Sequence, residues 1–182
     1  MHLAVALLAA VSWLHDSHGT ARRLNYAATA TFLGQEKPVT VQFYCDPTRT
    51  KDSVGALGFT LEIAGYESLK AFHFDDFEGP DAPASERALL EAATVRNGKT
   101  TAKFHAATTG WISVRNGFAF EVSAVFDRAS PAKDFLRALT EETDAVRITI
   151  TDTRDARVKL LLTIPMKGTR ADFKWLLAEL KK

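Results

Sequence analysis

Residues 131–182 read PAKDFLRALTEETDAVRITITDTRDARVKLLLTIPMKGTRADFKWLLAELKK, and this stretch decides the fold. Apolar side chains recur at helical spacing after Pro131 and again after Thr169, whereas residues 146–151 and 158–164 alternate between apolar and polar, as half-buried strands do. Ser130 and Thr169 are typical helix-capping residues. The stretch therefore predicts a helix, a β-hairpin and a final helix. Each helix has only about three turns, so it needs a sheet to pack on.

The same alternation of apolar and polar residues predicts strands upstream of this stretch. Asn97-Gly98 and Asn116-Gly117 lie between β-prone runs, and Asn-Gly pairs favour tight hairpin turns because both residues tolerate positive φ. Together with these hairpins, the alternation predicts strands over residues 24–32, 39–45, 57–63, 93–95, 101–105, 111–114 and 118–126.

The middle of the chain is less regular. Residues 66–74 fit a short helix or a strand, residues 78–85 a surface loop, and residues 86–93 one or two helical turns. About eight strands and two good helices result. The predicted fold class is β-rich α+β: an antiparallel β-sandwich or curved sheet with two C-terminal helices packed against it.

Length and composition fit one ordinary globular domain, since the chain has 182 residues, 46% of them hydrophobic and 25% charged. The net charge is +1, and no stretch concentrates Lys or Arg, which argues against nucleic-acid binding.

Cys45 is the only cysteine, so no intramolecular disulfide is possible. It falls on the apolar face of residues 39–45, which predicts a buried, inert thiol and a monomer without an intermolecular disulfide.

The N-terminal residues have the character of a secretory leader. Residues 3–14 are nearly all apolar, a run too short to span a bilayer but typical of the core of a signal peptide. Small residues at Ser17 and Gly19, or at Gly19 and Ala21, suit a cleavage site. We therefore expect residues 1–19 to be a signal peptide and residues 20–182 to be a single periplasmic or extracellular domain without a transmembrane segment.

The charges around the apolar run leave an alternative to the signal peptide open. No Lys or Arg precedes the run, and Arg22 and Arg23 follow it, where positive charge opposes export. Under this alternative the N-terminal segment is a buried helix of the domain.

The C-terminal third also resembles a known family. The helix containing Phe135-Leu136 and Leu139, the hairpin, Gly168 and the helix with Phe173 and Leu176 look like the C-terminal part of the invasion-associated locus B proteins. This resemblance implies a β-sandwich in the periplasm or outside the cell, with no catalytic residues. Paired cysteines are expected in that family, whereas Cys45 is alone here.

The densest group of possible metal ligands lies in FHFDDFEG, residues 72–79. His73, Asp75, Asp76 and Glu78 supply imidazole and carboxylate groups, which bind divalent metals. Their spacing matches no metal-binding loop, and the segment equally fits a solvated acidic loop with the three Phe side chains of the segment turned inward. We therefore predict no catalytic residue, no metal and no cofactor, and keep these four residues as the candidates for a metal.

Cys45 is a possible nucleophile, with His73 or His105 as its base. However, the sequence around Cys45 has no glycine turn and no helix start that would activate the thiol. The sequence contains no Gly-x-Ser-x-Gly turn, no phosphate-binding loop and no His-Glu-x-x-His. A packed core thiol is the favoured interpretation of Cys45.

Two further features have a functional and a structural interpretation. A mixed-charge turn is formed by Asp152, Arg154, Asp155 and Arg157. Its functional interpretation is a recognition loop, but we expect a solvated turn with weak surface ion pairs. Trp111 either stacks on a sugar or peptide at a rim or packs in the core, and core packing is favoured.

These observations predict a non-enzymatic exported bacterial protein. It would act as a binding module or envelope component for an unknown protein or small ligand. The alternative is a metal-dependent hydrolase that uses the acidic cluster of residues 73–78. A third possibility is a scaffold partner in a secretion or adhesion machine.

Overall fold

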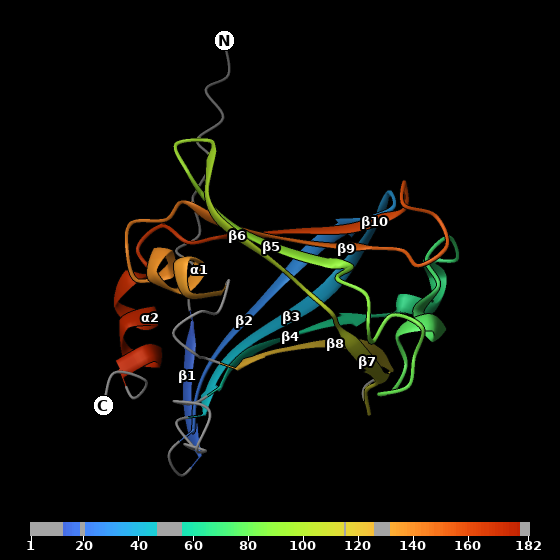
Figure 1. Cartoon of the computed structure of the whole chain (residues 1–182), viewed down its shortest axis with the longest axis horizontal. Coiled ribbons are helices and arrows are strands. Elements are labelled where there is room, and N and C mark those ends of the chain that lie inside the picture. Colours follow the sequence, from blue (N-terminus) through green and yellow to red (C-terminus); the bar gives the residue numbers. More distant parts are fainter. Residues whose placement is uncertain (1–12, 19–20, 47–55, 115, 126–131, 179–182) are drawn as a thin grey trace, which may run out of the picture.

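The computed structural model describes residues 13–18, 21–46, 56–114, 116–125 and 132–178. These residues form ten strands in two antiparallel sheets, together with two short α-helices near the C-terminus (Figure 1). The predicted β-rich α+β fold is therefore confirmed.

The first sheet has six strands and begins as a simple meander. Its strand order is β1-β2-β3-β4-β8-β7, so the β7–β8 hairpin joins the meander on the free side of β4. The strands are β1 (Leu14–His18), β2 (Ala21–Phe32), β3 (Gln35–Asp46), β4 (Ala56–Ala64), β7 (Thr109–Ile112) and β8 (Gly117–Val125).

The second sheet has four strands in the order β10-β9-β5-β6. Its first hairpin is the predicted one, because Asn97 and Gly98 have φ angles of 50° and 72°. In the second predicted turn, Asn116 has a φ of 55°, whereas Gly117 is already the first residue of β8. The strands of this sheet are β5 (Leu90–Arg96), β6 (Lys99–Ala106), β9 (Ala145–Thr151) and β10 (Lys159–Pro165).

The two helices lie together at one end of the sandwich (Figure 1). Helix α1 (Ala132–Leu139) packs on β5 and β6, where the rings of Phe135 and Phe104 are 4.9 Å apart. Helix α2 (Arg170–Leu176) packs near β2 and β3, where the rings of Phe173 and Phe43 are 5.2 Å apart. Because each helix is very short, these contacts are what hold it in place.

Helix capping differs from the prediction at Thr169. Its hydroxyl donates to the carbonyl oxygen of Met166 at 2.7 Å instead of capping the first turn of α2. Ser130, the other predicted cap, lies outside the described residues.

The apolar faces of both sheets meet in one core. The alternation predicted for the C-terminal hairpin is confirmed, because Val146, Ile148 and Ile150 are buried opposite three buried residues of β10, which are Ile164, Leu162 and Leu160. Cys45 is 1% exposed, in line with the buried alternate residues Val39, Val41 and Phe43 of β3. This burial confirms the predicted register of β3.

Three local predictions are wrong. Residues 90–93 belong to strand β5 (Leu90–Arg96) and not to the predicted helical segment, because β9 and β6 pair with β5 on both sides, whereas the strand predicted over residues 93–95 is confirmed. Trp111 is 41% exposed on the edge strand β7 and does not pack in the core. The described part of the chain contains ten strands and not about eight, because each of the nine ranges with strand character overlaps a strand and residues 14–18 add β1.

Two 3₁₀ turns occur in residues 66–77, of which residues 66–74 were expected to form a short helix or a strand. These turns are η1 (Tyr66–Ser68) and η2 (Phe74–Phe77), and they lie at the end of the sandwich opposite the two helices (Figure 1). The polar side chains of this segment form the candidate site.

The predicted leader is only partly within the described residues. Residues 1–12 lie outside them, whereas Leu14–His18 form β1, which excludes a helix over those five positions. Cleavage of residues 1–19 stays a prediction. No helix in the described ranges is both long and apolar enough to cross a bilayer.

Candidate functional site

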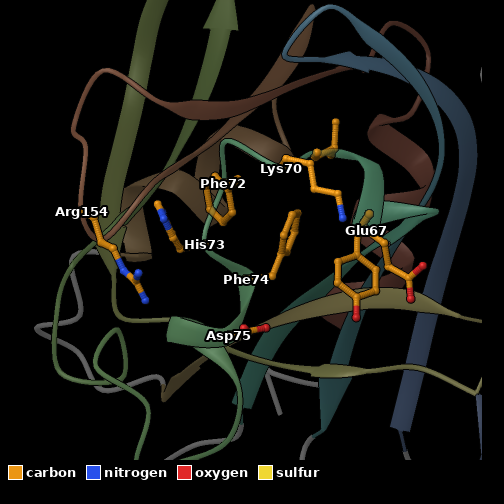
Figure 2. Close-up of a pocket in the computed structure, with 9 residues that line it drawn as sticks. Glu67, Lys70, Phe72, His73, Phe74, Asp75 and Arg154 are labelled. Carbon is orange, nitrogen blue, oxygen red and sulfur yellow. The ribbon is translucent and has the colours of Figure 1, made fainter.

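A pocket of about 370 Å³ opens between the segment that carries η1 and η2 and the turn that joins β9 to β10. Most of its lining comes from ten consecutive positions of the first segment, and the turn contributes a single arginine (Figure 2). The lining residues are Tyr66, Glu67, Leu69, Lys70, Phe72, His73, Phe74, Asp75 and Arg154.

Aromatic packing positions the polar side chains of this segment. Phe74 lies 5.0 Å from Phe118, and Phe77 lies 5.3 Å from Phe120, measured between ring centroids. Phe72 stacks on Phe77 at 5.3 Å. All three Phe side chains of the segment are therefore buried, as predicted. Because their rings fill the space below, the polar residues between them are directed toward solvent or toward the β9–β10 turn.

His73 is bound to Asp152, a residue 79 positions further along the chain. Its Nδ1 lies 3.1 Å from both carboxylate oxygens of Asp152, and its backbone N–H donates to Oδ2 at 2.7 Å. An ionised carboxylate only accepts hydrogen bonds, so Nδ1 must carry the proton. Nε2 is then the ring nitrogen left for a molecule in the pocket.

Asp152 is a buried carboxylate that also organises the β9–β10 turn. The backbone N–H groups of Arg154 and Asp155 donate to its Oδ1 at 2.9 and 3.0 Å. Burial acts to raise the pKa of Asp152, but the hydrogen bonds from His73, Arg154 and Asp155 outweigh it and hold this pKa below its usual value. Asp152 is 2% exposed, so the predicted solvated turn is wrong at this position.

A second charged pair joins the same two segments. Arg154 donates from Nε and Nη2 to the two carboxylate oxygens of Asp76, at 2.8 and 2.7 Å, and the hydroxyl of Thr153 also donates to Asp76. The hydrogen bond from Arg154 is the main cause that lowers the pKa of Asp76 to about 2. Such a two-point contact fixes orientation as well as distance.

Acid should weaken this connection in a defined pH range. A carboxylate whose pKa is lower in the folded chain stabilises the fold above its unfolded pKa, and this contribution is lost as the pH falls from about 4 through about 2. Between about pH 5 and pH 2, the wild-type protein should therefore lose about 1–2 kcal/mol more unfolding free energy than Asp76→Asn. Thermal unfolding of both proteins across this range is the measurement, and parallel stability curves would contradict the assignment.

The opposite end of the pocket is built around Tyr66. Its ring lies 4.9 Å from that of Phe74. Burial raises the pKa of the Tyr66 hydroxyl, and the nearby carboxylates of Glu67, Glu78 and Asp75 raise it further. Within the described ranges, none of these three carboxylates has a basic partner within 4 Å. The hydroxyl thus lies in the field of three carboxylates, of which that of Asp75 also acts on Arg154.

The structure separates the four candidate metal ligands. His73 contacts Asp152, Asp76 contacts Arg154, Asp75 lines the pocket, and Glu78 forms an isolated parallel bridge with Gly110. Among the residues that the structure describes, no group of three or more His, Cys, Asp or Glu side chains is placed to hold a metal.

The other sequence candidates are not part of this pocket. Cys45 is buried in β3, and His105 lies on β6 with its Nε2 3.3 Å from Glu91. Sequence reasoning missed Tyr66 as a site residue, and it named Asp152 only within a turn that it expected to be solvated. The Asp at the start of a polar turn was a signal for Asp152, since such residues often accept backbone N–H groups two and three positions on.

Comparison with protein-family models, curated proteins and solved structures gave no match to this chain. The pocket geometry and the charges around it therefore carry the functional interpretation.

Proposed function

We propose that this protein is a non-enzymatic exported protein that binds a small organic cation, such as an amine or a quaternary ammonium compound, in the pocket between Tyr66 and Arg154. Export is supported by the apolar run of residues 3–14 and the small residues that follow it. The single observation that carries the binding proposal is the pocket lining, in which the adjoining rings of Tyr66 and Phe74 occur together with the carboxylates of Glu67 and Asp75.

The charge balance around the pocket favours a positive ligand. Two of the lining residues, Glu67 and Asp75, are acidic and two, Lys70 and Arg154, are basic, and three further carboxylates (Asp76, Glu78 and Asp152) act on Tyr66 or Arg154 from just outside the lining. Three of these carboxylates, those of Asp76, Asp152 and Asp75, already act on Arg154, so its guanidinium is largely neutralised. An anionic ligand would meet repulsion from the remaining carboxylates.

The shape and chemistry of the lining fit the same class of ligand. A cation over the face of a tyrosine gains about 0.5–2 kcal/mol, depending on its desolvation. The rings of Tyr66 and Phe74 adjoin each other in the lining, to which Asp75 also belongs. Phe74 and Asp75 are labelled in Figure 2. The pocket volume of about 370 Å³ is within the range of small-molecule sites.

Titration calorimetry with choline and with acetate tests this proposal. We expect choline to bind and acetate not to bind. Asp75→Asn and Tyr66→Leu should each weaken choline binding by about five- to tenfold, because each removes about 1 kcal/mol of charge or cation–π attraction. Salt at about 0.5 M should weaken binding as well, since the carboxylates are exposed.

Glu86→Gln is the matched control, because it removes an exposed carboxylate that does not line the pocket. Equal loss of choline binding in Glu86→Gln and Asp75→Asn would show that the attraction is a diffuse surface effect. Binding of acetate in preference to choline would reverse the charge assignment.

A metal-dependent hydrolase stays the alternative, and the His73–Asp152 pair is the observation in its favour. An imidazole whose Nδ1 donates to a carboxylate presents Nε2 as a metal ligand or a general base. Metal analysis of the purified protein tests this alternative. Stoichiometric metal that is lost in His73→Ala and Asp75→Ala would favour the hydrolase, whereas metal-free protein that binds choline would favour the binding protein.

A further inference from the structure

Strand β7 differs from the other strands that end the two sheets. As far as the structure describes them, the sheets end in β1, β7, β10 and β6. Charged side chains and proline usually protect such edges from pairing with another chain. Strand β6 carries Lys99 and Lys103, β10 carries Lys159 and Pro165, and β1 carries Asp16. The sequence of β7, Thr-Gly-Trp-Ile, has no charge and no proline, so this edge lacks the usual protection.

The side chains at this edge are apolar and exposed. Trp111 is 41% exposed, Ile112 is 52% exposed, and Val114 just beyond the strand is fully exposed. Trp111 lies opposite Ala119 on the face turned away from the core, whereas Ile112 lies opposite the buried Phe118. Successive side chains of a strand point to opposite faces. A strand added beside β7 would therefore meet an aromatic ring on one face and an aliphatic side chain on the other.

The backbone groups of Ile112 point away from β8. The next residue, Ser113, donates its backbone N–H to the carbonyl oxygen of Gly117 at 2.8 Å, and residues of an antiparallel strand face their partner alternately. Gly110 faces the outer side as well, where its carbonyl oxygen accepts the N–H of Gly79 at 3.0 Å. In the described part of the chain, no backbone group pairs with Ile112 on that side. The edge is thus occupied at Gly110 and open at Ile112.

Carboxylates lie at both ends of this open edge. Glu62 accepts a hydrogen bond from the Ser113 hydroxyl at 2.5 Å, which places its carboxylate on the face that carries Trp111. Glu78 lies beside the start of β7. Among the residues that the structure describes, neither carboxylate has a basic side chain within 4 Å. A basic side chain beside Trp111 would therefore gain a carboxylate as well as an aromatic face.

We propose that β7 binds an extended segment of a partner protein in which basic and apolar residues alternate, and that this segment joins the first sheet as a further strand. Its backbone pairs with Ile112, its basic side chains lie near Trp111 and Glu62, and its apolar side chains lie beside Ile112. Strand β7 lies at the end of the sandwich opposite the two helices (Figure 1).

A second copy of this chain is a poorer occupant of the same edge. Pairing through two β7 strands would bring two Glu62 carboxylates to one face, where like charges repel each other. The proposal goes beyond the binding of a small cation, because no residue of β7 lines the pocket.

The experiment is titration of the ¹⁵N-labelled full chain with the peptide KVKVKVK, acetylated and amidated at its ends. We expect the Ile112 amide signal to shift and its hydrogen exchange to slow, because this amide gains a backbone partner. The peptide KKKKVVV has the same composition but should bind at least about tenfold more weakly, since only alternation places all lysines on one face of a strand. Saturating choline should not displace KVKVKVK, because β7 lies outside the pocket.

Four variants test the individual contacts. Ile112→Pro removes the outward N–H and should weaken KVKVKVK binding at least about tenfold. Trp111→Thr and Glu62→Gln should each weaken it about two- to fivefold. Leu161→Thr is the matched control, because Leu161 is 48% exposed on the edge strand β10, and it should leave binding unchanged. Trp111→Thr and Leu161→Thr change exposed side chains, so their unfolding temperatures should stay within about 2 °C of the wild-type value.

Equal binding of KVKVKVK and KKKKVVV, or unchanged binding in Trp111→Thr and Glu62→Gln, would overturn the proposal. Slow exchange of the Ile112 amide that develops with protein concentration in the absence of peptide would assign β7 to a second copy of the chain instead. Cellohexaose that shifts the Trp111 indole signal, where KVKVKVK does not, would assign this face to a carbohydrate. Failure of the choline titration would leave the β7 proposal standing, since the two sites share no residue.

Discussion

Phe120→Ala is expected to lower the free energy of unfolding by about 3–5 kcal/mol, the range for truncation of a fully buried aromatic residue. The Phe120 side chain is 0% exposed and lies 5.3 Å from Phe77, 4.9 Å from Phe118 and 6.1 Å from Phe72. Its removal leaves a cavity where β8 meets the segment that carries η2. For a domain of this size, the unfolding temperature should fall by roughly 10 °C or more.

Denaturant unfolding measures this effect, with Val114→Ala as the control. Val114 is fully exposed beside β7, so its truncation should change the stability by less than about 0.5 kcal/mol. If Phe120→Ala were as mild as Val114→Ala, the aromatic cluster would not be the core that supports the pocket. Binding of choline should weaken in Phe120→Ala too, because the η2 segment loses its support.

Asp152→Ala is the second substitution with a large expected effect, again about 3–5 kcal/mol. Breaking a buried charged network leaves its partners unsatisfied, and each buried donor without an acceptor costs about 1–3 kcal/mol. Asp152 accepts hydrogen bonds from the backbone N–H groups of His73, Arg154 and Asp155 as well as from the His73 ring. Its loss should both destabilise the domain and release the β9–β10 turn from the pocket.

Asp155→Ala is the matched control for this prediction. Asp155 lies in the same turn, but its side chain pairs with the exposed Arg157, its neighbour two positions on, and exposed pairs contribute about 0–1 kcal/mol. The loss of unfolding free energy in Asp152→Asn should lie between those of Asp152→Ala and Asp155→Ala, because the amide keeps one oxygen acceptor. Equal stabilities of Asp152→Ala and Asp155→Ala would contradict the role assigned to Asp152.

The sequence predicted the parts of the fold where local signals and burial agree. In β9 and β10, one face is buried and the other is not, so Val146, Ile148 and Ile150 alternate with polar residues. In β5 this signal is lost, because Ala92, Ala93 and Thr94 are all buried between neighbouring elements. The spacing of Leu90 and Ala93 then fits a helix as well as a strand.

The sequence predicted only part of the candidate site. His73 and the acidic residues after it stood out as a dense cluster, but their partners Asp152 and Arg154 lie 79 and 78 positions away from His73 and Asp76 respectively. A polar turn is usually solvated, and only the approach of a distant segment buries Asp152. Pairings between segments so far apart leave no trace in local spacing.

The most direct test of the pocket is ¹⁵N NMR of the His73 ring, with and without choline. We predict that Nδ1 carries the proton, held by Asp152, and that choline shifts the ring signals, whereas acetate does not. His105, outside the pocket, should show no shift and serves as the internal control. A His73 ring protonated on Nε2, as in free histidine, and unmoved by choline would contradict both the His73–Asp152 pair and the binding site.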